Sequence, residues 1–146
     1  MPVVERSIEI NAPIDRVFAA LTDPRRAAEW NPNVIEVRDF SGPLEVGATW
    51  RQTVAVAGRL QHLKVRVSRY SPPREGELEV TGDQRARIWT RCEDLGGRTR
   101  VTQGMDFAPP GGVLGVVGGP VARLMAEREI ERSMRLQREL LEGETS

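Results

Sequence analysis

The sequence is poor in cysteine and histidine and has no excess of either charge. Cys92 is the single cysteine, which excludes an internal disulfide and fits a reducing compartment. With His62 as the single histidine, a zinc site of the His/Cys-rich kind is excluded as well. Lysine plus arginine number 21, as do aspartate plus glutamate. Proteins that bind nucleic acid usually carry a basic excess, so the balanced charge predicts no nucleic-acid partner. The scarcity of cysteine and histidine predicts no metal site, and we expect no cofactor.

Long apolar runs are also missing. The N-terminus shows no basic start followed by an apolar core, so a secretory signal is not expected. The longest weakly polar stretch, residues 108–122, is rich in glycine and proline and falls short of the roughly 20 apolar residues of a membrane helix. The 146 residues, 39% hydrophobic and 29% charged, fit one globular domain over residues 1–146. We expect a cytoplasmic monomer or homodimer without an integral membrane segment.

Local patterns predict a strand and two short helices at the start of the chain. Residues 3–10 alternate between polar and apolar side chains, as a half-buried strand does, and Arg6 interrupts the apolar face. Residues 14–21 follow a proline and show apolar side chains at helical spacing. Asp23 can cap a second short helix over residues 24–30, which begins with a proline and ends before Asn-Pro.

The middle of the chain is predicted to be a meander of strands, and the end a helix. Turns with glycine or proline separate the apolar segments, and such short turns join antiparallel neighbours. A long amphipathic helix is expected over residues 120–142, before a frayed tail at 143–146. The glycine-rich run 111–119 is interpreted either as a plain loop or as a flexible gate. The predicted strands cover residues 34–40, 49–57, 60–70, 77–81, 86–94 and 98–107.

This order of elements resembles the START-like superfamily, also called SRPBCC or Bet v 1-like. Within it, the chain is most similar to the bacterial polyketide cyclase/dehydrase-like lipid-transport branch. The similarity covers essentially the whole chain. It is carried by the opening segment 4–24, Trp30 at the end of the second short helix, Val-Gly at 46–47, Tyr-Ser-Pro-Pro at 70–73 and the glycines before the last helix.

The resemblance implies an α+β helix-grip fold. In that fold a curved seven-stranded antiparallel sheet wraps around a long C-terminal helix, with two short helices between strands 1 and 2 and an apolar cavity between sheet and helix. The residue pattern alone also favours a two-layer α+β domain with such a cavity. Both ligand carriers and enzymes have this fold, so the function has to be argued from the residues of the cavity.

The alternation of side chains along each strand predicts the cavity wall. In the strand 86–94 two faces compete, and the face with Ile88, Thr90 and Cys92 is favoured over the face with Arg87, Trp89 and Arg91. The candidate ligand-binding residues are Trp30, Trp50, Gln52, Val65, Ile88, Thr90, Gln103, Met105, Leu124 and Met125.

Two amides stand out because they share faces with apolar residues. Gln52 and Gln103 need hydrogen-bond partners there, since burying an unpaired amide costs free energy. The partner is either a ligand or water, or the two amides and nearby Thr90 pair with one another. The tryptophans leave a similar choice, between stacking on a cyclic ligand and packing in the core.

No recognised catalytic set is visible. The sequence lacks the motifs H-E-x-x-H and G-x-S-x-G. His62 shares its strand face with Lys64 and Arg66, which predicts a solvent-facing position. Cys92 has no evident activating partner and is expected to be buried and inert. Carboxylates avoid the predicted inner faces, apart from Asp39 and Asp106.

We therefore predict binding or transport of a small hydrophobic ligand, such as a lipid, a polyketide or another cyclic or acyl molecule. One alternative is a polyketide cyclase, aromatase or dehydratase, which requires a titratable side chain such as Asp106, Arg87 or His62 inside the cavity. Another is a protein-interaction module, which requires an exposed apolar patch near residues 113–117.

Overall fold

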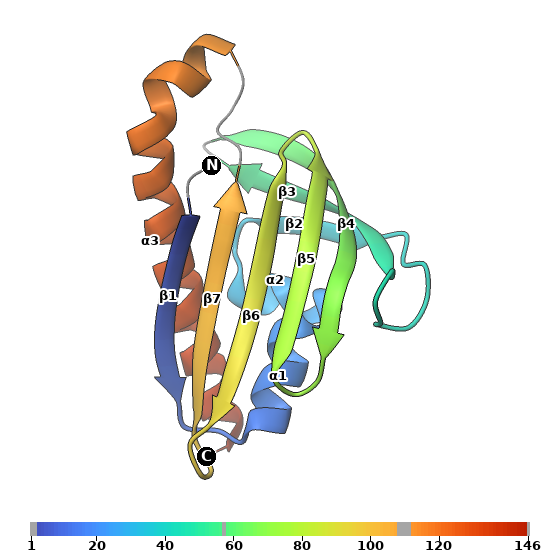
Figure 1. The fold of residues 1–146 in the computed structure, drawn as a ribbon, viewed down its shortest axis with the longest axis vertical. Coiled ribbons are helices and arrows are strands. Elements are labelled where there is room, and N and C mark those ends of the chain that lie inside the picture. The colour runs from blue at the N-terminus through green and yellow to red at the C-terminus, as the bar shows by residue number, and fades with distance from the viewer. Residues whose placement is uncertain (1–2, 57, 108–111, 146) are drawn as a thin grey trace.

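The computed structural model describes residues 3–56, 58–107 and 112–145. A seven-stranded sheet, two short helical segments and a long C-terminal helix make up the fold (Figure 1), which confirms the expected α+β class. The elements are β1 (Val3–Ile10), α1 (Ile14–Thr22), the 3-10 helix η1 (Pro24–Arg26), α2 (Ala27–Trp30), β2 (Val34–Arg38), β3 (Thr49–Val56), β4 (Arg59–Ser71), β5 (Glu75–Gly82), β6 (Ala86–Asp94), β7 (Thr99–Phe107) and α3 (Gly112–Thr145).

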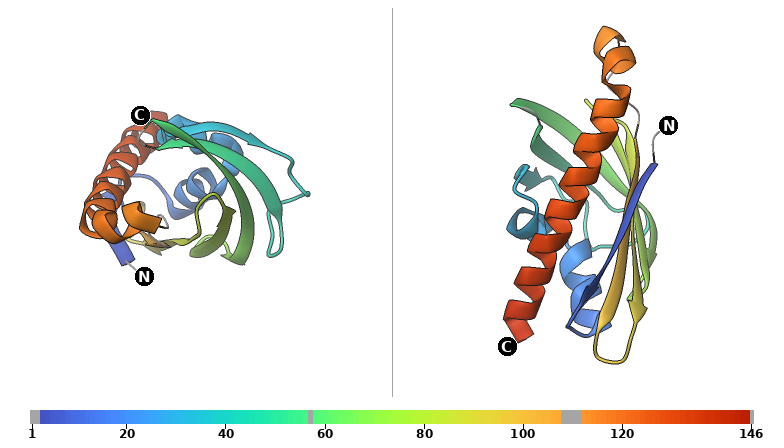
Figure 2. Two further views of the ribbon diagram at one scale, coloured as in Figure 1. Left: turned by 90° about the horizontal axis from the view of Figure 1, so that it is seen from above. Right: turned by 90° about the vertical axis from the view of Figure 1, so that its left-hand side faces the viewer.

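The sheet is antiparallel throughout, in the strand order β1-β7-β6-β5-β4-β3-β2. Strands β2 to β7 form a meander, and β1 completes the sheet at the β7 side. The sheet curves strongly, and α3 lies across its concave side (Figure 2). α1 packs against β6, and α2 packs against α3. This is the helix-grip arrangement that the family resemblance implies.

Most element boundaries agree closely with the sequence prediction. The strand predicted at 60–70 is observed as Arg59–Ser71, and the strand predicted at 77–81 as Glu75–Gly82. The helix predicted over residues 24–30 is divided into η1 and α2. The Asp23 carboxylate accepts a hydrogen bond from the backbone N–H of Arg25 at 2.9 Å, so Asp23 is the predicted cap.

The last helix is longer than predicted. α3 begins at Gly112 instead of residue 120 and extends to Thr145, and fraying of the tail 143–146 stays a prediction. Gly111 and Ser146 lie outside the described residues. Glycine disfavours helix, yet the apolar residues 113, 116 and 117 recur at helical spacing and continue the pattern of the helix towards the N-terminus.

Polar contacts attach α3 to β1, to the turn that follows β1 and to η1. Arg6, which interrupts the apolar face of β1, forms ion pairs with Glu131 at 3.2 Å and Glu127 at 3.6 Å. At the C-terminal end, Arg26 pairs with Glu144, and the backbone N–H of Asn11 donates to a carboxylate oxygen of Glu142 at 2.8 Å. The contacts of Arg26 and Asn11 thus attach the last turns of α3 to the start of the chain.

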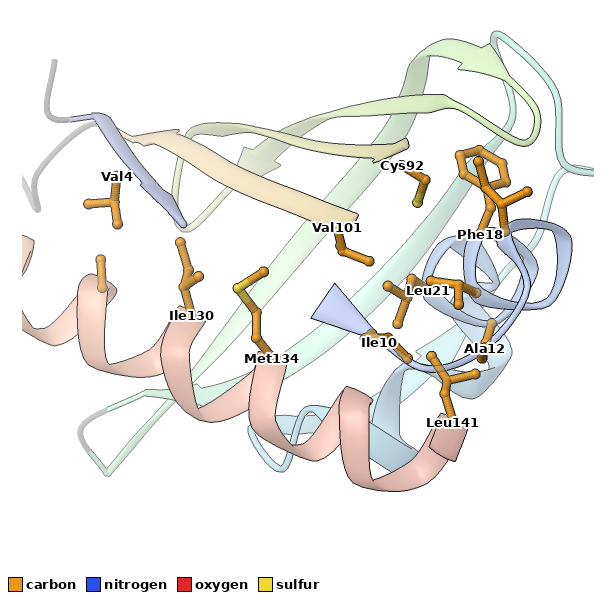
Figure 3. Packing of buried hydrophobic residues seen from close by; sticks show 14 of the residues in the cluster. Val4, Ile10, Ala12, Phe18, Leu21, Cys92, Val101, Ile130, Met134 and Leu141 are labelled. Atoms are coloured by element: carbon orange, nitrogen blue, oxygen red, sulfur yellow. The ribbon is translucent and has the colours of Figure 1, made fainter. Parts of the chain in front are cut away.

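Apolar packing holds the same side of the molecule together. Figure 3 shows Ile130, Met134 and Leu141 of α3 facing a cluster that includes Ile10 of β1 and Val101 of β7. Ile10, Val101 and Leu141 are fully buried. A second cluster, around Ala48, Trp50, Val65, Val67 and Val80, lies on the other strands.

Candidate functional site

A cavity of about 240 Å³ lies between the concave face of the sheet, the short helices α1, η1 and α2, and the long helix α3. It is neither sealed nor a shallow groove on the surface. Most of its wall is apolar, as is typical of small-molecule sites. The apolar side chains of the wall include Leu21, Ala27, Trp30, Leu44, Trp50, Val54, Val56, Leu63, Val65, Val67, Leu78, Val80, Ile88, Met105 and Ile130.

The structure brings together most of the residues singled out from the sequence. Alternation along β3, β4, β6 and β7 directs their side chains to the concave face, and in β6 the inward face is the favoured one with Ile88, Thr90 and Cys92. The role of the cavity residues in ligand binding stays a prediction. Those that line the cavity are Trp30, Trp50, Gln52, Val65, Ile88, Thr90, Gln103 and Met105.

Leu124 and Met125 do not join this group. Their exposed fractions are 46% and 44%, and they are absent from the cavity wall. Both precede Ala126, the first residue of α3 described as buried, and Glu129, the first residue of α3 in the wall. The apolar patch expected near residues 113–117 concerns side chains outside the described residues.

One cavity residue was missed because a β-bulge changes the alternation. The register of β4 against β5 shifts between Val67 and Arg69. Beyond the shift, Tyr70 lies in the cavity wall, and its ring packs on Phe18 with a centroid distance of 5.8 Å. A bulge adds one residue to a strand and reverses which side chains face inward, and strict alternation cannot reveal it.

The two amides of the sheet have partners within the protein. Gln103 donates from Nε2 to the hydroxyl of Thr90 at 3.3 Å. The indole N–H of Trp50 donates to Oε1 of Gln52 at 3.2 Å. Of the alternatives considered, pairing between Gln103 and Thr90 is therefore observed, whereas Gln52 pairs with a tryptophan instead of the other amide.

Polar residues of α3 also enter the cavity wall. Glu129, Ser133 and Gln137 are spaced by four residues and therefore share one face of the helix. Burial raises the pKa of the Glu129 carboxyl, and nearby Arg132 opposes that rise. The expectation that carboxylates avoid the inner surface is thus wrong for α3. It rested on the strands, although the four-residue spacing of these polar side chains was visible in the sequence.

The titratable residues considered for catalysis lie elsewhere. His62 and Arg87 are exposed, and alternation places both, with Asp106, on the convex face. Arg87 pairs there with Glu77 at 3.0 Å and with Asp106 at 3.9 Å. Asp39 is exposed as well.

Cys92 is buried within the core cluster that includes Ile10 and Val101, as expected. Burial raises the pKa of its thiol to about 12, so the thiol stays protonated and unreactive near neutral pH. Among residues 3–56, 58–107 and 112–145, no group of His, Cys, Asp and Glu side chains could hold a metal ion. Within the same ranges, no helix is long and apolar enough to cross a membrane.

Comparison with protein families assigns the chain to a family. A family model described as polyketide cyclase/dehydrase and lipid transport matches residues 1–142. The chain belongs to this polyketide cyclase/dehydrase and lipid-transport family. No curated protein matches the sequence significantly.

Solved structures share the fold of this chain over nearly its whole length. The protein TTHA0849 from Thermus thermophilus superposes with a TM-score of 0.82 at 15% identity, covering 99% of this chain and 100% of its own. The Zhui aromatase/cyclase from Streptomyces sp. R1128 gives a TM-score of 0.73 at 24% identity, covering 98% and 92%. A START superfamily protein from Mycobacterium smegmatis gives 0.77 at 16% identity, covering 97% of each chain.

Proposed function

We propose that this protein binds a small hydrophobic ligand, such as a lipid, a polyketide or another cyclic or acyl molecule, in the cavity between the sheet and α3. The observation that carries the proposal is the largely apolar wall around about 240 Å³. An apolar molecule that enters this space leaves water and gains dispersion contacts with the wall. The lipid-transport description of the family supports the same conclusion.

A bulky substitution in the cavity tests this proposal. Ile88 is a half-buried residue of β6 and lines the cavity, so an indole at this position occupies the space for a ligand. We expect Ile88→Trp to weaken binding of a fluorescent anilinonaphthalene probe about tenfold or more, as measured by titration.

The matched control places the same side chain on the opposite face of the neighbouring strand. Thr81 of β5 is exposed, and the side chain of adjacent Val80 points into the cavity. Thr81→Trp should bind the probe as the unmodified protein does. If Ile88→Trp, with its cooperative thermal unfolding intact, also binds the probe normally, the cavity is not the binding site and the proposal is wrong.

Glu129 favours a second candidate function, that of a cyclase- or dehydratase-type enzyme. Its carboxyl lies in the cavity wall, and burial raises its pKa. Such a group keeps its proton to higher pH than an exposed glutamate and can protonate a carbonyl oxygen. One similar structure, at 24% identity, is named an aromatase/cyclase.

An isosteric substitution separates the two candidates. If Glu129 is a general acid, Glu129→Gln should lower turnover of a poly-β-keto substrate at least about a hundredfold and leave probe binding unchanged. Turnover should also fall as the pH rises through the pKa of Glu129, because the acid form is lost. The exposed Glu139 of the same helix provides the control substitution Glu139→Gln. Turnover that is unaffected by Glu129→Gln rules out this role.

A further inference from the structure

The side chain of Gln137 is buried in α3 without a partner. It is 0% exposed, and among the described residues neither its amide oxygen nor its amide nitrogen has a hydrogen-bond partner. An unpaired buried amide has lost its hydrogen bonds to water and gained none in exchange, which is unfavourable. Because Gln137 lines the cavity, the partner that satisfies it can come from a molecule inside that cavity.

Two polar pairs on the sheet side of the wall differ from Gln137, whereas Trp30 resembles it. On the sheet, Gln103 is already bonded to Thr90, and Trp50 to Gln52. On α2, the indole N–H of Trp30 is buried and unpartnered among the described residues. α2 packs against α3. The buried wall groups without a partner in the described part of the chain therefore lie on α2 and α3. They are the N–H donors of Trp30 and Gln137 and one acceptor, the amide oxygen of Gln137.

The charges of the wall disfavour an anionic group at this place. A carboxylate can accept hydrogen bonds from the N–H donors, but it cannot donate one to the amide oxygen of Gln137. The basic side chain in the wall, Arg69, is exposed and already pairs with Glu75 at 3.5 Å. Glu129, about 12 Å along the same helix face, is an acidic group and supplies no positive charge to hold an anion. A neutral group with both a donor and an acceptor matches Gln137 better.

We propose that the ligand has an apolar body and one uncharged polar group with adjacent donor and acceptor atoms, a carboxamide or a hydroxyl beside a carbonyl, which binds Gln137. This inference rests on the proposed binding function and narrows its ligand class. The apolar body lies against the sheet, and the polar group faces α3. Gln137 thus selects among hydrophobic molecules by their polar end.

Two probes of equal chain length test the inference. Octanamide and octanoate share one apolar chain, and at about pH 8 the carboxylate of octanoate is ionised. We expect the unmodified protein to bind octanamide at least about tenfold more tightly than octanoate, measured by calorimetry or by displacement of the fluorescent probe. Gln137→Met removes the amide and keeps the approximate length of the side chain, so it should reduce this preference to less than about twofold.

Controls separate this inference from the proposed function. Gln84→Met replaces another, partly exposed glutamine of the wall and should keep the preference, and Gln137→Leu replaces Gln137→Met if the latter fails to fold. Equal binding of the two probes by the unmodified protein, or a preference that persists in both Gln137 variants, overturns the inference and leaves the binding function standing. If the protein binds neither probe nor the anilinonaphthalene, the binding function itself fails.

Discussion

Leu141→Ala should lower the free energy of unfolding by about 3 kcal/mol, because it leaves a hole in the core where α3 meets the sheet. Leu141 is 0% exposed and belongs to the same cluster as Ile10 and Met134 (Figure 3). For a chain of this size the loss corresponds to a decrease in melting temperature of about 10 °C, which differential scanning calorimetry can measure.

The same substitution on another turn of α3 provides the control. Leu124 is 46% exposed, so Leu124→Ala removes little buried surface and replaces leucine by the residue with the best helix propensity. Its effect should stay within about 0.5 kcal/mol. Equal melting temperatures for the two variants would show that the C-terminal end of α3 does not pack as described.

Gly82→Ala should cost about 3 kcal/mol, since the backbone at the end of β5 leaves no room for a side chain. Gly82 has a φ of +105°, and a Cβ atom there would lie 2.5 Å from the carbonyl oxygen of His62. That oxygen belongs to the backbone of β4 and accepts a hydrogen bond from the N–H of Asp83 at 3.1 Å. It cannot move aside as a flexible side chain could, so both strands must shift.

Gly96→Ala separates the cost of the left-handed backbone conformation from the cost of the close contact with His62. Gly96 has a φ of +83°, but a Cβ atom at this position would have no neighbour within 4 Å. Its replacement should therefore cost only the left-handed backbone conformation, about 1 kcal/mol. Urea denaturation of both variants measures the difference. If Gly82→Ala is no less stable than Gly96→Ala, the close approach to His62 is not a real constraint.

Strand alternation predicted the sheet side of the cavity because each strand has one apolar face. Trp50, Val65 and Ile88 follow that rule, and all three line the cavity. The position of Tyr70 in the cavity wall was not predicted, because a bulge is a feature of strand pairing that the sequence of one strand does not display. The amides were recognised as needing partners, but the partners depend on register between strands, as in the bond from Gln103 to Thr90.

The helix side of the cavity was harder to predict. Leu124 and Met125 belong to the apolar stripe of α3, but which part of a long helix reaches the sheet depends on where the helix is anchored. Arg6 provides one such anchor through Glu127 and Glu131. These contacts join residues more than a hundred positions apart, and neither sequence segment alone indicates its partner.

The pairing of β1 with β7 has a consequence for how the chain folds. Val3 lies opposite Asp106, so about 100 residues separate partners in adjacent strands. During synthesis the first strand emerges from the ribosome long before its neighbour exists, and its apolar side chains have no sheet to join. Closing the sheet therefore requires contacts of high sequence separation, whose loop-closure entropy is costly. α3 packs on β1, so its docking also joins distant parts of the chain.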